Sequence, residues 1–236
     1  MRNTLFQEKS IKGVFEIHLF YLFAVSILPG ILWVWYFYRK DKYDPEPARL
    51  IIRDFFLGMI IVYPASLLES PFSHIFEKNV SLIILLISAI LFIGIIEEGV
   101  KGFAIYKSHH LHPDFDEPID GIIYGVTVGL GFAAFENLFY TILYGYKVGI
   151  IRAVLTSLAH ASFSGIFGFY FAVSEINNSK SYLLRGLLIV SVLHGLYDFL
   201  IIANIISTFG TIIIIALLQL YLGFILHQMS EISPFK

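Results

Sequence analysis

Residues 80–106 read VSLIILLISAILFIGIIEEGVKGFAIY, a long apolar segment that carries two adjacent glutamates and a lysine. A transmembrane helix needs about 20 predominantly apolar residues, so this segment is long enough to cross a bilayer. Glu97, Glu98 and Lys101 then lie at membrane depth, where an ionisable side chain is costly and normally faces a partner inside a helix bundle. The segment therefore predicts a membrane helix with one polar face.

The composition of the whole chain also indicates a membrane protein. Of its 236 residues, 57% are hydrophobic and 14% are charged, whereas about 25% are charged in a typical soluble domain. A net charge of −2 provides no basic face for nucleic acid, so we expect no nucleic-acid partner. The chain has no cysteine, which excludes disulfides, zinc–thiolate sites and cysteine nucleophiles.

Hydropathy predicts seven spans. The second one is short and contains Pro64, which favours a kink or a partly interfacial position. The uncharged run over residues 199–230 is too long for one span, and Asn204, Ser207 and Gly210 predict a turn within it. We expect an all-α, polytopic membrane helix bundle of about seven transmembrane helices, or eight, with a polar active site inside one domain over residues 1–236. The predicted spans are residues 15–38, 48–68, 80–106, 119–145, 151–174, 183–204 and 207–229.

The lysines and arginines of the connections predict an orientation. With the N-terminus outside, the connections inside hold nine of them and those outside hold six. Positive charge favours the cytoplasmic side, so this excess predicts an outside N-terminus and an inside C-terminus. The charged loop over residues 39–47 is the strongest cytoplasmic marker.

Five charged residues lie inside the predicted spans, namely Glu97, Glu98, Lys101, Glu136 and Asp198. Glu97 and Lys101 are four residues apart, so they can form an ion pair. That pair leaves Glu98 unexplained, because Glu98 lies about 100° further round the helix. A buried carboxylate of this kind suits a general base or a proton-coupled transporter.

Other polar residues in the spans add to this cluster. His194 and Asp198 are also four residues apart, so the carboxylate can orient the imidazole. Glu136 precedes Tyr140 by four residues, and the phenol can donate a hydrogen bond to it. His160 has no charged residue one turn away, and alone it would be read as a packed core residue.

Small residues recur every fourth position in the fourth predicted span. Gly121, Gly125, Gly129 and Ala133 form a stripe that lets a second backbone approach closely. We expect this stripe to seat the helix against its neighbours and to turn Glu136 inward. A histidine-rich loop, residues 109–112, could bind a metal, but a solvated polar loop is the better interpretation.

Four motifs occur in order on separate predicted spans and resemble the PrsW family of bacterial intramembrane proteases. They are EExxK over residues 97–101, FExxxY over residues 135–140, His160, and HxxxD over residues 194–198. The resemblance covers roughly residues 29–200 and includes the acidic proline loop over residues 41–47. Where the family pattern has glycine four residues after His160, this chain has Ser164, which is also small. The PrsW family is grouped with the CPBP superfamily, which includes the prenyl-protein (CAAX) endopeptidases.

The resemblance implies an enzyme in the bacterial cell membrane. A PrsW-like protein is expected to cleave a single-span membrane protein embedded in the same lipid bilayer. The best-known role of the family is the first cut, at site 1, of an anti-sigma factor, on its extracytoplasmic side, in stress-response signalling. That role makes an anti-sigma-factor-like protein the expected partner.

The resemblance also implies roles for the polar residues. Glu97 with His160 would activate water, while His194 and Asp198 would stabilise the oxyanion. Glu98 and Glu136 would support these groups or act as a second base. Lys101 would keep a carboxylate ionised, and the other supporting residues would be Tyr140 and Asn137. We expect a glutamate-dependent protease without a cofactor.

Three alternatives stay open from the sequence. A zinc-dependent version of the same protease would use Glu97, His160 and His194 as ligands, although no HExxH motif is present. A proton-coupled membrane transporter would use the same groups as a relay, but the chain shows no inverted repeat. A catalytically inactive membrane scaffold would have little need for the intact motif set.

Overall fold

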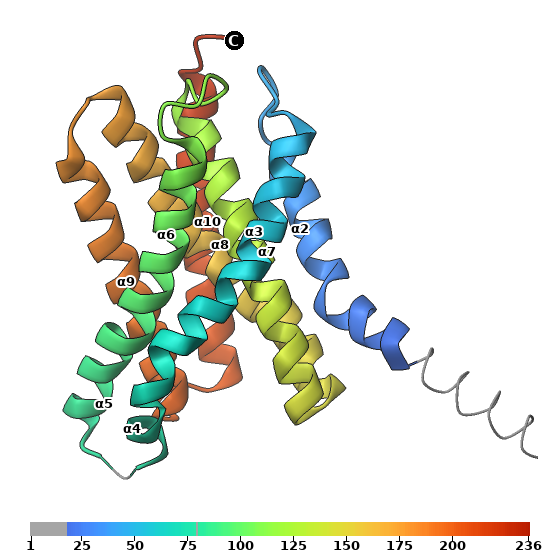
Figure 1. Cartoon of the computed structure of the whole chain (residues 1–236), viewed down its shortest axis with the longest axis vertical. Helices are drawn as coiled ribbons and strands as arrows, with labels where there is room; N and C mark the ends of the chain where they lie inside the picture. The colour runs from blue at the N-terminus through green and yellow to red at the C-terminus, as the bar shows by residue number, and fades with distance from the viewer. Residues whose placement is uncertain (1–17, 79) are drawn as a thin grey trace, which may run out of the picture.

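The computed structural model describes residues 18–78 and 80–236, and every regular element in these two ranges is a helix (Figure 1). The predicted all-α class is confirmed. Helix His18–Tyr38 ends in α2 (Leu28–Tyr38). Three further elements form the second helical run, namely α3 (Ala48–Glu69), η1 (Ser70–Phe72) and α4 (Ser73–Glu77). The remaining elements are α5 (Leu82–Ser88), the π-helix η2 (Ala89–Gly94), α6 (Ile95–His109), α7 (Pro118–Tyr144), α8 (Tyr146–Ile176), α9 (Lys180–Ile202) and α10 (Thr208–Glu231).

Within the described ranges, seven helical runs are long and apolar enough to cross a membrane, which agrees with the predicted number. The predicted turn inside residues 199–230 is also present, because α9 ends at Ile202 and Ser207 caps the start of α10. The expected start of the first span at residue 15 lies outside the described residues.

The second span differs from the prediction, since it is long and not short. It runs for 30 residues, Ala48–Glu77, through α3, η1 and α4. Pro64 lies inside α3 without ending it, because apolar residues continue past it and α3 packs along α7. This added length places Glu69 beside the polar residues of the bundle interior.

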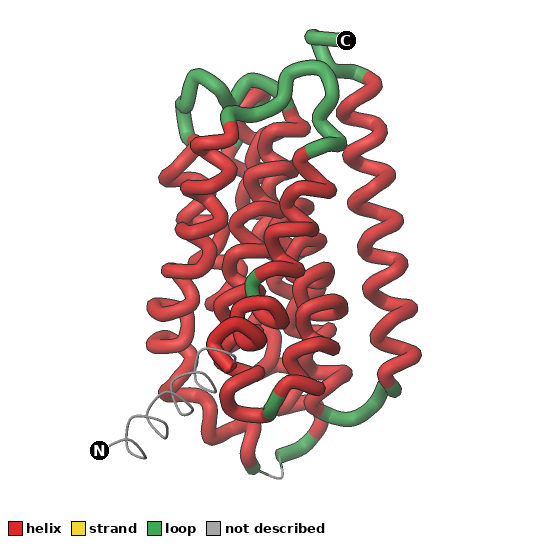
Figure 2. The backbone as a smooth tube through the Cα atoms, turned by 90° about the vertical axis from the view of Figure 1, so that its right-hand side faces the viewer, coloured by secondary structure: helices red, strands yellow, loops and turns green. Residues whose placement is uncertain are grey.

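Helices α7 and α8 form the centre of the bundle, and the other spans pack around them (Figures 1 and 2). The glycine stripe of α7 faces α8. A Cβ added at Gly129 would lie 2.6 Å from the His160 carbonyl oxygen, and one at Gly125 would overlap the carbonyl oxygen of Ser164. Close backbone contact therefore accounts for these small residues.

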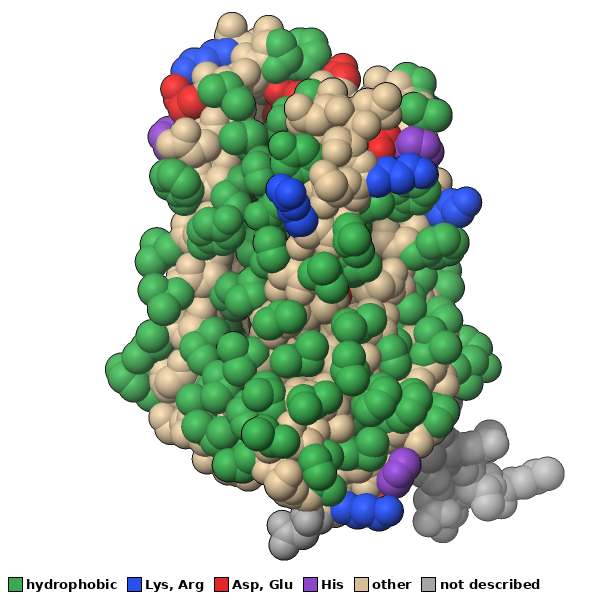
Figure 3. All heavy atoms as spheres, turned by 90° about the vertical axis from the view of Figure 1, so that its left-hand side faces the viewer, with side chains coloured by type: hydrophobic (Ala, Val, Ile, Leu, Met, Phe, Trp, Pro, Cys, Tyr) green, Lys and Arg blue, Asp and Glu red, His purple; other side chains and the backbone are tan. Residues whose placement is uncertain are grey.

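The outer surface is apolar over most of its height. Hydrophobic side chains cover the middle of the face in Figure 3, and most charged side chains lie towards the two ends. Large side chains such as Leu217, Leu220 and Phe224 point outward from α10 and are mostly exposed. Such a continuous apolar belt is expected of a bundle that is surrounded by lipid.

Candidate active site

The polar site forms where the π-helix η2 meets α9. A Cβ added at Gly94 would overlap the Ser191 carbonyl oxygen, and one at Gly195 would overlap the Ile90 backbone. These two glycines allow the backbones to touch, and a π-helical turn of this kind often occurs at a functional site. As a result, His194 of α9 lies directly beside Glu98 of α6.

Lys101 is the charged centre of the site. Its ammonium Nζ lies 3.0 Å from Glu97 Oε2 and 2.7 Å from Glu98 Oε1, and all three side chains are buried. The expected pair of Lys101 with Glu97 is therefore present, and the lysine also pairs with Glu98, which the sequence left unexplained. One flexible lysine side chain reaches both carboxylates, because the i, i+3 and i, i+4 positions lie on adjacent parts of one helix face.

His194 contacts acidic groups from two helices. Its Nδ1 lies 2.8 Å from Glu98 Oε1, while its Nε2 lies 3.4 Å from Asp198 Oδ2. The HxxxD spacing does bring the imidazole and Asp198 together, but the closer contact is with Glu98. Sequence spacing could not reveal that contact, since the two residues are 96 positions apart.

His160 of α8 has a charged group near each ring nitrogen. Lys101 Nζ lies 2.9 Å from Nδ1, and Glu136 Oε2 lies 3.1 Å from Nε2. With lysine as the donor to Nδ1, the ring carries its proton on Nε2 and donates to Glu136. His160, which looks isolated in the sequence, thus connects the EExxK and FExxxY motifs in space.

Arg152 belongs to this site although the sequence analysis did not select it. Its Nη2 donates to Glu136 Oε2 at 2.9 Å, and its Nε donates to Asn137 Oδ1 at 3.2 Å. Arg152 lies near the start of α8, two turns before His160. In the sequence Arg152 lies at the edge of the fifth predicted span, where a charge needs no explanation, so no sequence signal distinguishes it.

The predicted hydrogen bond from Tyr140 to Glu136 does not occur between these two described residues. The guanidinium of Arg152 lies 3.6 Å from the centroid of the Tyr140 ring, and the arginine itself bonds to Glu136. A long cationic side chain from α8 thus takes the place expected for the phenol, and Tyr140 stacks on it. Asn137 is buried and also donates to Ser157 Oγ at 3.0 Å.

A second missed residue is Glu69, at the end of α3. Its Oε1 is buried and has no hydrogen-bond partner in the described ranges, and Glu97 and Glu136 lie within electrostatic range. Glu69 lines a pocket of about 240 Å³ together with Ile93, one turn before Glu97, and three serines. The short predicted second span ended at residue 68, so Glu69 appeared to be an ordinary boundary charge.

Four residues can place ligand atoms around one point. Single atoms of Glu97, Glu98, His160 and His194 all lie within 4.8 Å of one another. Glu98 Oε2 is buried and has no hydrogen-bond partner among the residues that the structure describes. Two imidazoles and two carboxylates form a donor set that zinc accepts, so these residues fit a metal ion. The set contains the three ligands expected from the sequence and adds Glu98.

The histidine-rich loop is not simply solvated. His109 is fully buried, and its Nε2 lies 2.5 Å from Asp54 Oδ2. Its ring stacks on Tyr124 at a centroid distance of 3.7 Å, and Tyr124 donates to Glu46. The solvated-loop interpretation is therefore wrong for His109, because α3 and α7 cover it and supply its partners.

Comparison with known proteins agrees with the motifs. Residues 46–225 match the family described as PrsW family intramembrane metalloprotease. The chain belongs to the PrsW family. The protease PrsW of Bacillus subtilis is 38% identical over 192 residues, which cover 78% of this chain and 84% of the relative. The region that matches the family includes all four candidate metal ligands, Glu97, Glu98, His160 and His194.

Further PrsW relatives cover a similar part of the chain. The protease PrsW of Geobacillus kaustophilus is 35% identical over 188 residues, 79% of this chain and 82% of the relative. That of Shouchella clausii is 33% identical over 201 residues, 84% of this chain and 88% of the relative. No solved structure matches the chain significantly. The expected PrsW family and a membrane-embedded protease are thus confirmed.

Proposed function

We propose that this PrsW protease cleaves a peptide bond of a single-span membrane protein, and that its substrate is an anti-sigma factor cut at site 1. The carrying observation is the buried cluster of Glu97, Glu98, His160 and His194, whose candidate atoms lie within 4.8 Å of one another. Four convergent ionisable groups inside a membrane bundle are costly unless they serve a function. The anti-sigma substrate rests on the family resemblance.

Glu97 is the proposed general base. Its Oε2 lies 3.9 Å from His160 Nδ1 and 3.9 Å from His194 Nε2, and Lys101 Nζ at 3.0 Å keeps it ionised. Glu97 takes a proton from the attacking water as its oxygen bonds to the scissile carbonyl carbon. The same proton then passes to the leaving amine when the C–N bond breaks.

The other polar residues would orient these groups. Asp198 and Glu98 hold the His194 ring from its two nitrogens, so an N–H can be directed at the developing oxyanion. Glu136, itself held by Arg152, fixes the His160 ring through Nε2. Lys101 balances the charge of the two adjacent glutamates.

We further propose that the enzyme depends on a divalent metal ion, and not on glutamate alone. Glu97, Glu98, His160 and His194 would surround this ion, and Glu97 would keep its role as the general base beside it, in accord with the metalloprotease description of the family. A zinc ion held there would supply Lewis-acid polarisation of the scissile carbonyl. In the metal-free arrangement, Lys101 Nζ is the cation that Glu97, Glu98 and His160 share.

We propose an outside N-terminus and an inside C-terminus. The C-terminus lies at the same end as the α2–α3 loop, and the α4–α5 connection lies at the opposite end (Figures 1 and 2). The pocket beside Glu69 is lined by Ser70 and Ser73 of η1 and α4, so it lies towards the α4–α5 end. This orientation would admit substrate from the extracytoplasmic side, as site-1 cleavage requires.

The test is co-expression with epitope-tagged candidate anti-sigma factors. We expect the wild-type chain to shorten its substrate, and Glu97→Gln, Glu98→Gln and His160→Ala to abolish cleavage. Glu231→Gln is the matched control, because this exposed carboxylate lies at the far end of α10. An unchanged cleavage pattern in all three site variants would refute the proposed site.

Two further experiments test metal dependence and the transporter alternative. Purified enzyme treated with a tight chelator should lose cleavage and regain it with zinc, and activity that survives chelation would contradict the metal proposal. Reconstituted liposomes report any pH-driven flux. Flux that depends on Glu97, with every tested single-span protein left intact, would favour the transporter.

A further inference from the structure

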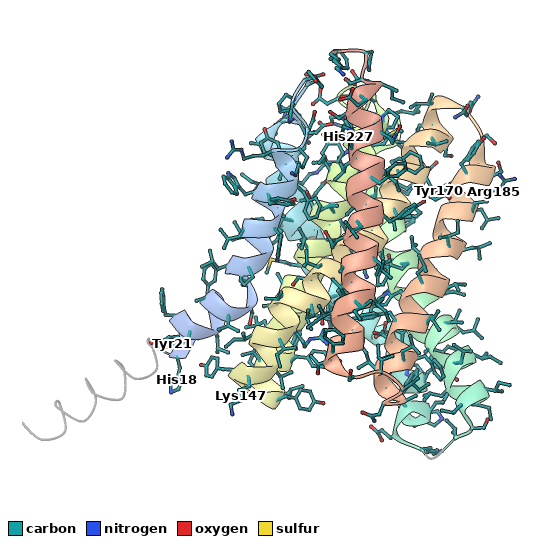
Figure 4. The ribbon with its side chains drawn as sticks, turned by 180° about the vertical axis from the view of Figure 1, so that it is seen from behind. His18, Tyr21, Lys147, Tyr170, Arg185 and His227 are labelled. Atoms are coloured by element: carbon teal, nitrogen blue, oxygen red, sulfur yellow. The ribbon has the colours of Figure 1, made fainter. Side chains whose placement is uncertain are left out.

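A groove separate from the catalytic cluster lies between α2 and α10. It has a volume of about 630 Å³ and is lined by residues of α2, of the loop that follows it, and of α10. Both helices pack against α7 and α8, and they leave this space between them. Figure 4 shows α10 in front with α2 to its left. The groove wall includes exposed apolar residues such as Leu220 and Tyr36, so it faces lipid.

The α10 side of the groove is a continuous stripe. Ala216, Leu220, Gly223, His227 and Ser230 follow one another at intervals of three or four residues and share one helix face. At the middle, a Cβ added at Gly223 would meet nothing within 4 Å, so the glycine leaves open space. From Ala216 to Ser230 the stripe rises through 14 residue steps, or roughly 21 Å along the helix axis.

Two lysines and a histidine line one end of this groove. Lys40 and Lys42 come from the loop after α2, and His227 comes from α10. The Lys40 ammonium lies 4.6 Å from the centroid of the Tyr36 ring. The nearby carboxylate of Glu231 is paired with Lys236 at 2.5 Å, so it does not form an ion pair with either groove lysine. The opposite end, around Ala216, is apolar.

The length and charge of the groove match one class of occupant. A single leaflet has a hydrocarbon depth of about 15 Å plus its headgroup region, which agrees with the roughly 21 Å stripe. A helix that spans both leaflets needs about 30 Å, so the groove is too short for a substrate helix. Basic pockets between transmembrane helices recognise anionic lipid headgroups.

We propose that this groove binds an anionic phospholipid, with the phosphate at Lys40 and Lys42 and an acyl chain along Gly223 and Ala216. Binding is selective for headgroup charge, because the cations are concentrated at the interfacial end. The site is independent of the catalytic chemistry and of the identity of the substrate.

The two tryptophans of the chain, Trp33 and Trp35, provide the readout, because both lie on α2 within one turn of the groove residues Tyr36 and Phe37. The full chain is reconstituted in phosphatidylcholine bilayers that contain brominated phosphatidylglycerol or brominated phosphatidylcholine at the same mole fraction. Non-selective lipid around the bundle quenches equally in both cases. We expect stronger quenching by the brominated phosphatidylglycerol, and equal quenching would overturn the proposal.

Two variants test the site itself. Lys40→Gln combined with Lys42→Gln should remove the preference, at about fivefold in lipid affinity per lysine. Gly223→Leu should fill the groove and also reduce the preference for phosphatidylglycerol. The folded structure has space for a side chain at this position. Arg185→Gln is the matched control, since this arginine lies at the same end as His227 but on α9 (Figure 4).

Each remaining outcome has a defined meaning. A preference that persists in the double lysine variant, or that survives Gly223→Leu, would overturn the assigned site. Loss of the preference in Arg185→Gln would show a general surface effect and would also overturn it. If a single-span substrate peptide relieves the quenching equally well with either brominated lipid, the groove belongs to the substrate helix.

Discussion

Lys101 illustrates how a single buried residue can hold a site together. Its ammonium group lies within 3.0 Å of Glu97 Oε2, Glu98 Oε1 and His160 Nδ1. An unpaired buried charge costs several kcal/mol, so these groups are stable together and costly apart. The same three partners belong to the proposed metal ligands, which makes lysine and metal competitors for one set of atoms.

Replacing Lys101 should therefore change stability and metal response together. Lys101→Met leaves two buried carboxylates without their cation, and we expect about 3–5 kcal/mol of destabilisation without metal. Added zinc should raise the melting temperature of the variant more than that of the wild type. Lys107→Met is the control, because Lys107 is exposed on the same helix. A variant that melts with the wild type in metal-free buffer would contradict this interpretation.

Arg152 should act through Glu136 as a positioning residue. Arg152→Ala frees Glu136, which then no longer fixes the His160 ring, so we expect substrate cleavage to slow by about 10- to 100-fold. Arg152→Lys keeps the charge but cannot bond to Glu136 and Asn137 at once, and it should recover part of the rate. The melting temperature of each variant is measured in parallel. Wild-type cleavage by Arg152→Ala would refute the role.

Pairs of helices bring the site residues together through close backbone contact. Two glycines join η2 to α9, and the α7 stripe sits on α8 at Ser164 and His160. Serine fits at position 164 because its backbone faces Gly125 and its small side chain lies against Gly129, which has no Cβ. Small residues thus determine which helices can carry catalytic groups to one place.

Gly129→Ala should test this contact. The added Cβ would lie 2.6 Å from the His160 carbonyl oxygen, so α8 must shift, at a cost of about 1–3 kcal/mol. Because the contact is at His160 itself, the cleavage rate should fall by more than the loss of folded protein accounts for. Gly223→Ala, which meets no atom within 4 Å, should leave cleavage unchanged. Equal behaviour of the two variants would count against the helix-contact argument.

At the level of the whole molecule, the two ends of the bundle differ in chemistry. The end that carries the α2–α3 loop contains buried acidic groups outside the spans, among them Asp41 and Glu46. Burial, and then the charge of Glu117, raises the pKa of Asp41 from 3.8 to about 6. Burial likewise raises the pKa of Glu46, with the neighbouring Asp120 as the next cause.

These raised pKa values predict a stability that falls as pH rises. A carboxyl group with a folded pKa above its unfolded value favours the folded state at low pH, and this contribution is lost as pH rises through the folded pKa. For Asp41 this loss of stability takes place between about pH 4 and about pH 6. Asp41→Asn should weaken the fall of the melting temperature across this range and raise the melting temperature at pH 7 by about 2–4 °C.

Thermal melting between pH 4 and pH 8 checks this prediction. Glu77→Gln is the control, because Glu77 is exposed at the opposite end of the bundle. If Asp41→Asn keeps the full pH dependence of the wild type, the buried loop carboxyl is not its source.

Much of the architecture followed from local chemistry. Hydropathy placed seven spans because each must bury about 20 apolar residues in lipid, and Ser207 marked the last turn. Charges that are rare at membrane depth identified Glu97, Glu98, Lys101, Glu136 and Asp198 directly. Short-range spacing correctly paired Lys101 with Glu97 and His194 with Asp198, since those contacts lie within one helix.

Contacts between helices needed the folded structure. Lys101 with His160, His194 with Glu98, and Arg152 with Glu136 join residues on different helices. Their pairing depends on how closely the backbones approach, and glycines such as Gly94 and Gly195 set that distance. Helix periodicity reports only which face of one helix is polar. Whether a charge such as Glu69 or Arg152 belongs to the site is decided by the neighbouring helix that the fold brings beside it.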